Sequence, residues 1–220
     1  MKRLVPIIAM ALVLVSCGTD PTPTPAPACP TEAPTSVSAQ AALENADMAT
    51  LQLGGAVEGE MVMELYGDQA PLATASFVAL ARCGFYDGVT FHRVIPGFVI
   101  QAGDPGTRAN RGDFPGVGGG GPGYQFEIEP PADGLRYDPY VVAMANDTRA
   151  NGSQFFIGLA DLDQQLHAAG VYTIFGKVVD GTDLVDEVAQ VPVSGTDLPL
   201  TPVIIESITI SGTAEASPET

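Results

Sequence analysis

The sequence is poor in the residues that build metal centres, disulfide scaffolds and nucleic-acid interfaces. It has no tryptophan, three cysteines and two histidines, and its 9 basic residues face 26 acidic ones, giving a net charge of -17 over 220 residues. A surplus of negative charge repels phosphates, which argues against binding to nucleic acid. The cysteines and histidines lack metal-ligand spacing, so we expect no metal and no cofactor.

The hydrophobic run near the start is too short to cross a membrane. Residues 4–15 are apolar, whereas a spanning helix needs ~20 residues. The run follows Lys2 and Arg3, as in a signal peptide, here residues 1–16. It ends in Leu-Val-Ser-Cys, which resembles the lipobox of bacterial lipoproteins. That resemblance implies lipid attachment at Cys17 and a place in the cell envelope, anchored to the membrane outside the cytoplasm. An ordinary secretory signal with a chance cysteine is the alternative.

Composition divides the rest of the chain into three parts. Residues 17–50 begin with the cysteine and continue as a Pro/Thr-rich tether, residues 51–212 form one globular domain, and residues 213–220 are a polar tail. Prolines remove backbone donors and favour an extended chain, so the tether is expected to be semi-rigid. Cys29 and Cys83 are left either as a disulfide or as two free thiols.

The globular part has the pattern of many short strands and two helices. The helices are expected at 71–83 and 183–190, with a third, short helix considered around 41–47. The expected strands are 60–66, 89–95, 98–101, 125–129, 141–145, 154–159, 173–178 and 203–210. Short strands separated by Gly and Pro suggest a closed antiparallel barrel, although a sandwich fits the pattern as well.

Residues 91–104, Phe-His-Arg-Val-Ile-Pro-Gly-Phe-Val-Ile-Gln-Ala-Gly-Asp, carry the strongest signal of function. They place Arg93 and Gln101 among apolar residues, on two strands joined by a Pro-Gly turn. A buried cation is costly without a partner, so Arg93 is a candidate ligand-binding residue; an ion-paired structural arginine is the alternative. By spacing alone Phe98 fits either a pocket or the core. His92 should face the other side of the strand as a hydrogen-bonded structural histidine.

This segment resembles the signature of the cyclophilins, a family of peptidyl-prolyl cis-trans isomerases. Five further stretches match family motifs in the family's order: residues 70–80, 119–126, 143–146, 151–157 and 172–178. The resemblance implies a mainly β fold, a closed eight-stranded antiparallel barrel capped by two α-helices. Two features depart from the family, namely the absent pocket tryptophan and a longer loop at 160–171.

The resemblance also implies which residues act. The catalytic group is Arg93, Gln101 and Phe98, and the substrate-binding residues are Val99, Ala145, Asn146, Gln154, Phe156, Leu166 and Tyr172. Leu162 competes with Leu166 for the place of the pocket leucine. The implied partners are Pro-containing peptides and unfolded exported proteins, bound by a monomer. A proline-binding module or chaperone with little turnover is the alternative function.

The chemistry of isomerisation explains these residue types. Rotation about an Xaa-Pro bond breaks amide resonance, and the barrier is about 18–20 kcal/mol. No nucleophile is required, because the site only has to favour the twisted amide over the planar one. An apolar recess disfavours the charge-separated planar form. A fixed guanidinium can donate to the prolyl nitrogen or the carbonyl oxygen as the geometry changes.

Overall fold

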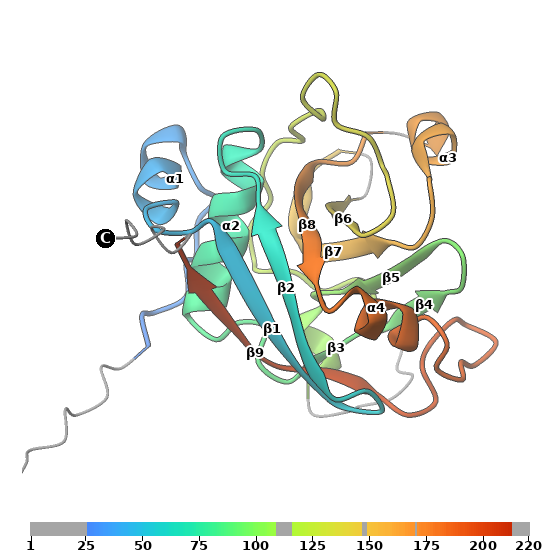
Figure 1. Cartoon of the computed structure of the whole chain (residues 1–220). Coiled ribbons are helices and arrows are strands. Elements are labelled where there is room, and N and C mark those ends of the chain that lie inside the picture. Colours follow the sequence, from blue (N-terminus) through green and yellow to red (C-terminus); the bar gives the residue numbers. More distant parts are fainter. Residues whose placement is uncertain (1–25, 109–115, 147–148, 170, 213–220) are drawn as a thin grey trace, which may run out of the picture.

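The computed structural model describes residues 26–108, 116–146, 149–169 and 171–212. The predicted signal peptide, the predicted lipid-attachment residue Cys17 and the predicted polar tail lie outside the described residues. Nine strands form one antiparallel sheet that curls around a core, with helices packed on its ends and outer side (Figure 1). The strands are β1 (Met48–Gly55), β2 (Gly59–Leu65), β3 (Val89–Thr90), β4 (Arg93–Ile95), β5 (Val99–Ala102), β6 (Val141–Asn146), β7 (Asn151–Gly158), β8 (Ile174–Asp180) and β9 (Val203–Ser211). The helices are α1 (Ser36–Ala42), α2 (Pro71–Arg82), η1 (Pro105–Thr107), α3 (Asp163–Ala169) and α4 (Thr182–Val188).

The two ends of the sheet are neighbours in the sequence. The strand order is β3-β9-β1-β2-β8-β6-β7-β5-β4. The single strand predicted at 89–95 is split because the chain changes partners in its middle. The Phe91 N–H donates to Val203 O, whereas the His92 N–H donates to Gln101 O. The mainly β, antiparallel prediction is confirmed, and the sheet has nine strands rather than eight.

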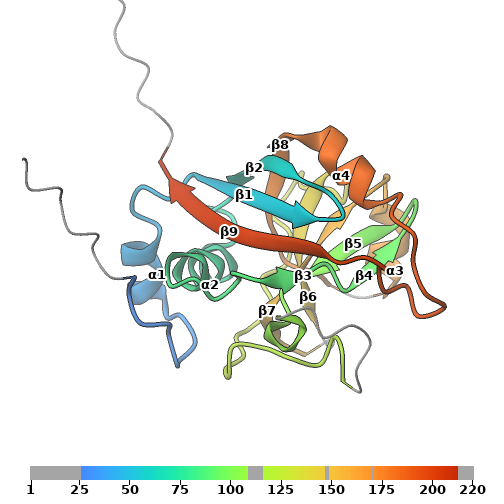
Figure 2. The ribbon, with the colours of Figure 1, turned by 90° about the horizontal axis from the view of Figure 1, so that it is seen from below.

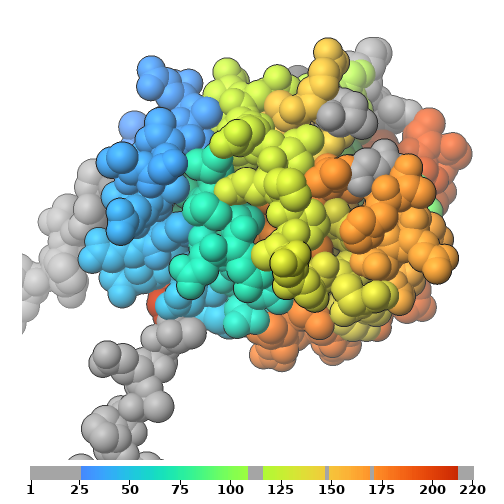
Figure 3. Space-filling view, turned by 90° about the horizontal axis from the view of Figure 1, so that it is seen from above, coloured from blue at the N-terminus to red at the C-terminus, as the bar shows by residue number. Residues whose placement is uncertain are grey.

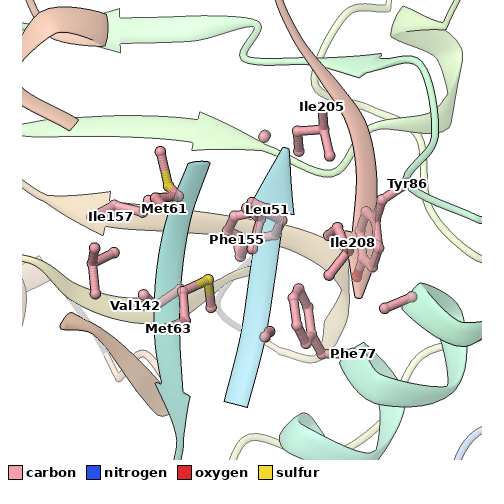
Figure 4. Packing of buried hydrophobic residues seen from close by; sticks show 14 of the residues in the cluster. Leu51, Met61, Met63, Phe77, Tyr86, Val142, Phe155, Ile157, Ile205 and Ile208 are labelled. Atoms are coloured by element: carbon pink, nitrogen blue, oxygen red, sulfur yellow. The ribbon is translucent and has the colours of Figure 1, made fainter. Parts of the chain in front are cut away.

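Alternating side chains fill the interior of the curled sheet. On β1 and β2, every second residue is buried, including Leu51, Met61 and Met63 (Figure 4). From α2, Phe77 packs against the ring of Phe155 with 5.7 Å between centroids. The period of two in the strands therefore produces one continuous core on the concave face.

Helix α2 begins and ends for identifiable reasons. Pro71 occupies the first turn, where its missing N–H costs nothing. The Glu129 carboxylate accepts hydrogen bonds from the N–H groups of Leu72 and Ala73, both at 2.9 Å. After the helix, Gly84 adopts φ of 73°, a left-handed conformation that favours glycine. Eight of the 12 side chains of α2 are buried, so the helix closes one end of the core.

The prediction of a strand at 125–129 is wrong. Only an isolated bridge forms there, between Phe126 and Asn151. Three residues later the Glu129 N–H donates to the Thr173 hydroxyl oxygen instead of to a strand carbonyl. The segment therefore leaves the sheet and delivers the Glu129 side chain to α2.

The predicted number of helices is too low. Helices α2 and α4 confirm the two expected ones, but α1 and α3 are also present. The short helix considered at 41–47 starts earlier, because Thr35 and Ser38 form a capping box. Helix α3 lies inside the segment predicted as the loop 160–171. None of the described helices is long and apolar enough to cross a bilayer.

A disulfide joins the N-terminal segment to the domain. Cys29 and Cys83 are bonded, which decides between the two alternatives left by the sequence. Helix α1 lies beside α2 in two perpendicular views (Figures 1 and 2). The Arg82 guanidinium donates to Ala42 O at 2.7 Å and to Glu44 O at 3.1 Å. From Cys29 onward, the N-terminal segment is thus attached to α2.

We expect Cys29→Ser/Cys83→Ser to be less stable than wild type. The disulfide closes a loop with a sequence separation of 54 residues, and loss of such a constraint typically lowers the free energy of unfolding by roughly 2–4 kcal/mol. Urea denaturation measures the change. Dithiothreitol should lower the midpoint of wild type and leave that of the double variant unchanged; equal midpoints without reductant would contradict the expectation.

Candidate functional site

Pairing between four strands aligns the polar and aromatic candidates on the outer face of the sheet. Arg93 of β4 is opposite Gln101 of β5, which is opposite Phe156 of β7, which is opposite Ala143 of β6. Side chains of directly paired residues point to the same face. One row across the sheet therefore runs from the guanidinium to the phenyl ring, although Arg93 and Phe156 are 63 positions apart in the sequence.

The predicted pocket residues belong to a hydrophobic cluster of their own. The neighbours on β7, Phe155 and Ile157, face the core, whereas Phe156 faces outward. The second cluster consists of Val99, Tyr137, Val141, Ala143, Phe156, Leu162, Leu166 and Ile174, with Phe98, Ala145 and Tyr172 among the partly buried residues packed against it. Phe156 is buried within this second cluster and Phe98 packs against it, so neither belongs to the larger cluster on the concave face.

Arg93 is held by neutral groups. Its guanidinium lies over the Phe98 ring, with 5.9 Å from Cζ to the centroid, and its Nη1 donates to Gln101 Oε1 at 3.4 Å. Among the described carboxylates, none forms an ion pair with Arg93. The described part of the chain therefore offers no carboxylate partner that would make Arg93 an ion-paired structural arginine. A guanidinium that is half-buried and not neutralised can direct its charge to a ligand.

Arg93 is the last member of a chain of hydrogen bonds that starts at the carbonyls of Gly118 and Gly120, and these carbonyls determine the direction of the chain. Gln154 Nε2 donates to the carbonyl oxygens of Gly118 and Gly120, both at 2.8 Å. Two carbonyls can only accept, so the Gln154 amide oxygen must point the other way, where it accepts from Gln101 Nε2 at 3.0 Å. The Gln101 oxygen is then turned toward Arg93. Two backbone carbonyls thereby orient both amides and the guanidinium.

The loop that supplies these carbonyls is anchored by a buried carboxylate. Asp104 accepts from the N–H groups of Gly106 and Gly118, each at 2.7 Å. A Cβ atom at Gly120 would lie 2.0 Å from Asp104 Oδ1. Glycine is therefore required where the loop passes over the carboxylate.

A cavity adjoins this hydrogen-bond chain. It has a volume of about 330 Å³ and is lined by Gln101, Ala145, Asn146, Gln154 and the 118–122 stretch, among others. Seen from above, the segment between β5 and β6, drawn in yellow-green, lies between α2 and the orange α3 segment (Figure 3). The outer face thus offers an apolar cluster and a polar cavity, joined at Gln101. Among the described residues, no group of three His, Cys, Asp or Glu side chains converges as a metal site.

Comparison with known proteins gives a family for this arrangement. The family model described as cyclophilin type peptidyl-prolyl cis-trans isomerase matches residues 48–210. The chain belongs to this family. It is a cyclophilin-type isomerase, an enzyme that interconverts the cis and trans forms of Xaa-Pro bonds.

Named relatives and solved structures agree with the assignment. Peptidyl-prolyl cis-trans isomerase A of Mycobacterium tuberculosis is 41% identical over 172 residues, covering 70% of this chain and 87% of the relative. An isomerase-like protein of Dictyostelium discoideum is 38% identical over 153 residues, covering 69% and 89%. The cyclophilin-type isomerase of Cryptosporidium parvum superposes with a TM-score of 0.65 at 32% identity, covering 77% of this chain and 99% of that one. That protein has also been solved in the presence of the dipeptide Ala-Pro.

In this cyclophilin-type chain, the predicted site residues lie together. Val99, Phe156, Leu166 and Tyr172 are in or against the second cluster. The other predicted residues, Arg93, Phe98, Gln101, Ala145, Asn146 and Gln154, lie along the hydrogen-bond chain, the cluster or the cavity. Both Leu162 and Leu166 are buried in the cluster, so the structure does not separate these two candidates.

Sequence reasoning missed the support beneath these residues. In the sequence, Asp104 is only the last residue of the 91–104 motif, and the carbonyls of Gly118 and Gly120 carry no side-chain signal. The run of four glycines at 118–121 was the available clue, since glycine runs often mark places where backbone approaches another group closely.

His92 is buried, and neither ring nitrogen makes a hydrogen bond of ordinary geometry with a described residue. Burial lowers the pKa of His92. Asp104 and hydrogen bonding by the Thr90 backbone and the Gln154 side chain oppose this effect, and Arg93 reinforces it.

We expect the stability of wild type to fall as the pH drops below about 6.5, the usual pKa of histidine. The pKa of His92 is lower in the folded state than in the unfolded state, so the unfolded chain binds the proton more readily in this window. The contribution of neutral His92 to the free energy of unfolding is fully present above pH 6.5. This contribution is lost as the pH falls from 6.5 through the folded-state pKa. Tm measured from pH 8 to 5 should therefore fall more steeply for wild type than for His92→Phe. The carboxylates are common to both proteins, so parallel curves would exclude the effect of His92.

We expect Gln154→Glu to lower kcat/KM by about tenfold, the effect of losing one good hydrogen bond in a polarised chain. A carboxylate cannot donate to the two glycine carbonyls, so Gln101 and Arg93 lose their fixed orientation. The matched control is Gln52→Glu on β1, since Gln52 also donates to backbone carbonyls, those of Leu53 and Gly59, far from the site. A protease-coupled assay gives both values, and an equal effect of the two variants would contradict the role of Gln154.

Proposed function

We propose that the isomerase acts at the outer face of β4, β5, β7 and β6, with the substrate proline against Phe98, Phe156 and Tyr172. The observation that carries this proposal is the Arg93 guanidinium, which lies over the Phe98 ring and donates to Gln101. It is a positive charge beside an apolar cluster, without a described carboxylate to neutralise it. Val99 and Leu166 complete the apolar wall.

Catalysis then follows from differential binding of the twisted amide. The planar Xaa-Pro amide is charge-separated, and an apolar wall stabilises it less than water does. In the twisted form, the prolyl nitrogen regains a lone pair and can accept a hydrogen bond. A guanidinium has five N–H donors, and Gln101 accepts from one nitrogen of Arg93. The remaining donors are available to the prolyl nitrogen or the carbonyl oxygen, so their interaction strengthens as the bond turns.

The peptide on either side of the proline extends past Gln101 toward the cavity. Ala145, Asn146 and Gln154 line this cavity and are the proposed groove for the substrate backbone. Asn146 Nδ2 donates to Val171 O at 3.0 Å, which ties this edge of the groove to the segment before β8. Binding of Ala-Pro by this chain is supported by the dipeptide used with the Cryptosporidium parvum relative.

We infer that the sheet closes into the predicted eight-stranded barrel, with β3 and β4 as the halves of one bent strand. Support comes from the bonds of Phe91 to β9 and of His92 to β5, which make consecutive residues bridge the two ends of the sheet. A closed barrel leaves no free strand edge, which is consistent with the proposed monomer.

The proposed clients are unfolded exported proteins, and the proposed location is the outside of a bacterial membrane. Both follow from the predicted signal peptide over 1–16 and the predicted lipid attachment at Cys17. Because Cys29 is bonded to Cys83, the tether between Cys17 and the disulfide consists of residues 18–28. Eleven residues of extended chain span about 34 Å, so the domain would stay close to the membrane surface.

A proline-binding module with little turnover is the second candidate function. It would use the same aromatic cluster and would not need an oriented guanidinium. The hydrogen-bond chain from Gly118 and Gly120 to Arg93 therefore favours catalysis over binding alone.

We expect Arg93→Ala to lose about 10²- to 10³-fold in kcat/KM, the usual effect of removing one preorganised donor. The loss should lie mainly in kcat, because the donor acts on the twisted amide. The control is Arg82→Ala on α2, which removes a guanidinium that donates to the carbonyl oxygens of Ala42 and Glu44 and does not contact the cluster. NMR exchange measurements on an Ala-Pro peptide separate binding from turnover. Unchanged turnover with Arg93→Ala would reject the catalytic assignment and favour another site.

A further inference from the structure

Tyr137 is a buried residue beside the proposed proline pocket that the mechanism above does not use. It lies in the segment before β6, its side chain is 2% exposed, and it belongs to the second hydrophobic cluster. A phenol in such a place requires hydrogen-bond partners, because an unpaired buried hydroxyl is costly.

The Tyr137 hydroxyl finds both partners on one residue. It donates to the carbonyl oxygen of Tyr172 at 2.8 Å and accepts from the N–H of Tyr172 at 3.1 Å. Burial raises the pKa of Tyr137, so the phenol keeps the proton that it donates. Tyr172 lies just before β8, outside any strand. The Tyr137 hydroxyl therefore takes the place of a neighbouring strand as the hydrogen-bond partner of the Tyr172 N–H and carbonyl groups.

The rest of Tyr137 contacts the segment that forms α3. Its N–H donates to Asp163 Oδ1 at 3.2 Å, and its carbonyl accepts from the Leu162 N–H at 2.8 Å. Its ring packs edge-on against His167, with centroids 5.3 Å apart. One residue thus contacts both the start and the last turn of this short helix.

These two attachments lead to the walls of the pocket. The Tyr172 ring packs edge-on against Phe156, with centroids 5.5 Å apart, and α3 carries Leu166 into the same cluster. We propose that Tyr137 is a positioning residue that holds Tyr172 and α3 in place as the walls of the proline pocket. This inference rests on the site assigned under the proposed function.

The proposal makes a kinetic distinction between Tyr137 and Arg93. Tyr137→Phe keeps the walls apolar toward the amide and loosens only their contacts with the proline ring. These ring contacts are the same in the planar and the twisted states, so they contribute uniform binding. Loss of uniform binding raises KM and leaves kcat unchanged. A residue needed only for folding would change Tm and the active fraction, and KM would stay the same.

The test is Tyr137→Phe in the full chain, which keeps the ring and removes only the hydroxyl. We expect KM for an Ala-Pro peptide to rise about three- to tenfold, as expected for the loss of one or two hydrogen bonds, with kcat within about twofold of wild type. Hydrogen exchange of the Tyr172 amide should become faster, since its acceptor is gone. The matched control is Tyr140→Phe, which removes a phenol that bonds to exposed Asp186 and should change neither value.

Three outcomes overturn the proposal: an unchanged KM, a fall in kcat alone, or a raised KM with the Tyr172 amide as protected as before. In a double-mutant cycle, Tyr137→Phe should add little to the KM of Tyr172→Ala, because its effect passes through that ring. Amide exchange reports the bond to Tyr172 whether or not the pocket binds proline. A failed site assignment, detected with Arg93→Ala, is therefore distinguishable from a failed role of Tyr137.

Discussion

The register between β4, β5, β7 and β6 is the constraint on which the site depends. Because side chains alternate between the faces of a sheet, a shift by one residue would turn Arg93 and Gln101 into the core and Val94 and Ile100 outward. The large inner cluster makes such a shift costly. The core thus fixes the position of the guanidinium without touching it.

The direction of the side-chain hydrogen bonds in the site is determined by a loop outside the sheet. The Asp104 carboxylate holds the glycine-rich loop, and the loop presents two carbonyls to Gln154. Each amide has one donor end and one acceptor end. The orientation of Gln154 therefore determines the orientation of Gln101, which turns its oxygen toward Arg93. Preorganised dipoles of this kind need no rearrangement when a bound Xaa-Pro bond turns, and in the proposed mechanism they lower the rotational barrier.

Much of this arrangement was predictable from the sequence. Apolar alternation and Gly/Pro punctuation located most strands, and the family motifs located Arg93, Gln101 and Phe156. The errors have physical reasons. Residues 125–129 look like a strand, but a threonine hydroxyl binds the Glu129 N–H, and α3 is only seven residues long and is held by Tyr137. Contacts that depend on backbone carbonyls, such as those of Gly118, or on partners far away in the sequence, leave no local pattern.

The most direct test of the account is the location of a bound proline. In NMR spectra of the full chain with an Ala-Pro peptide, the account predicts contacts from the pyrrolidine protons to the rings of Phe98, Phe156 and Tyr172. Contacts confined to the cavity at residues 118–122, with none to these three rings, would contradict it.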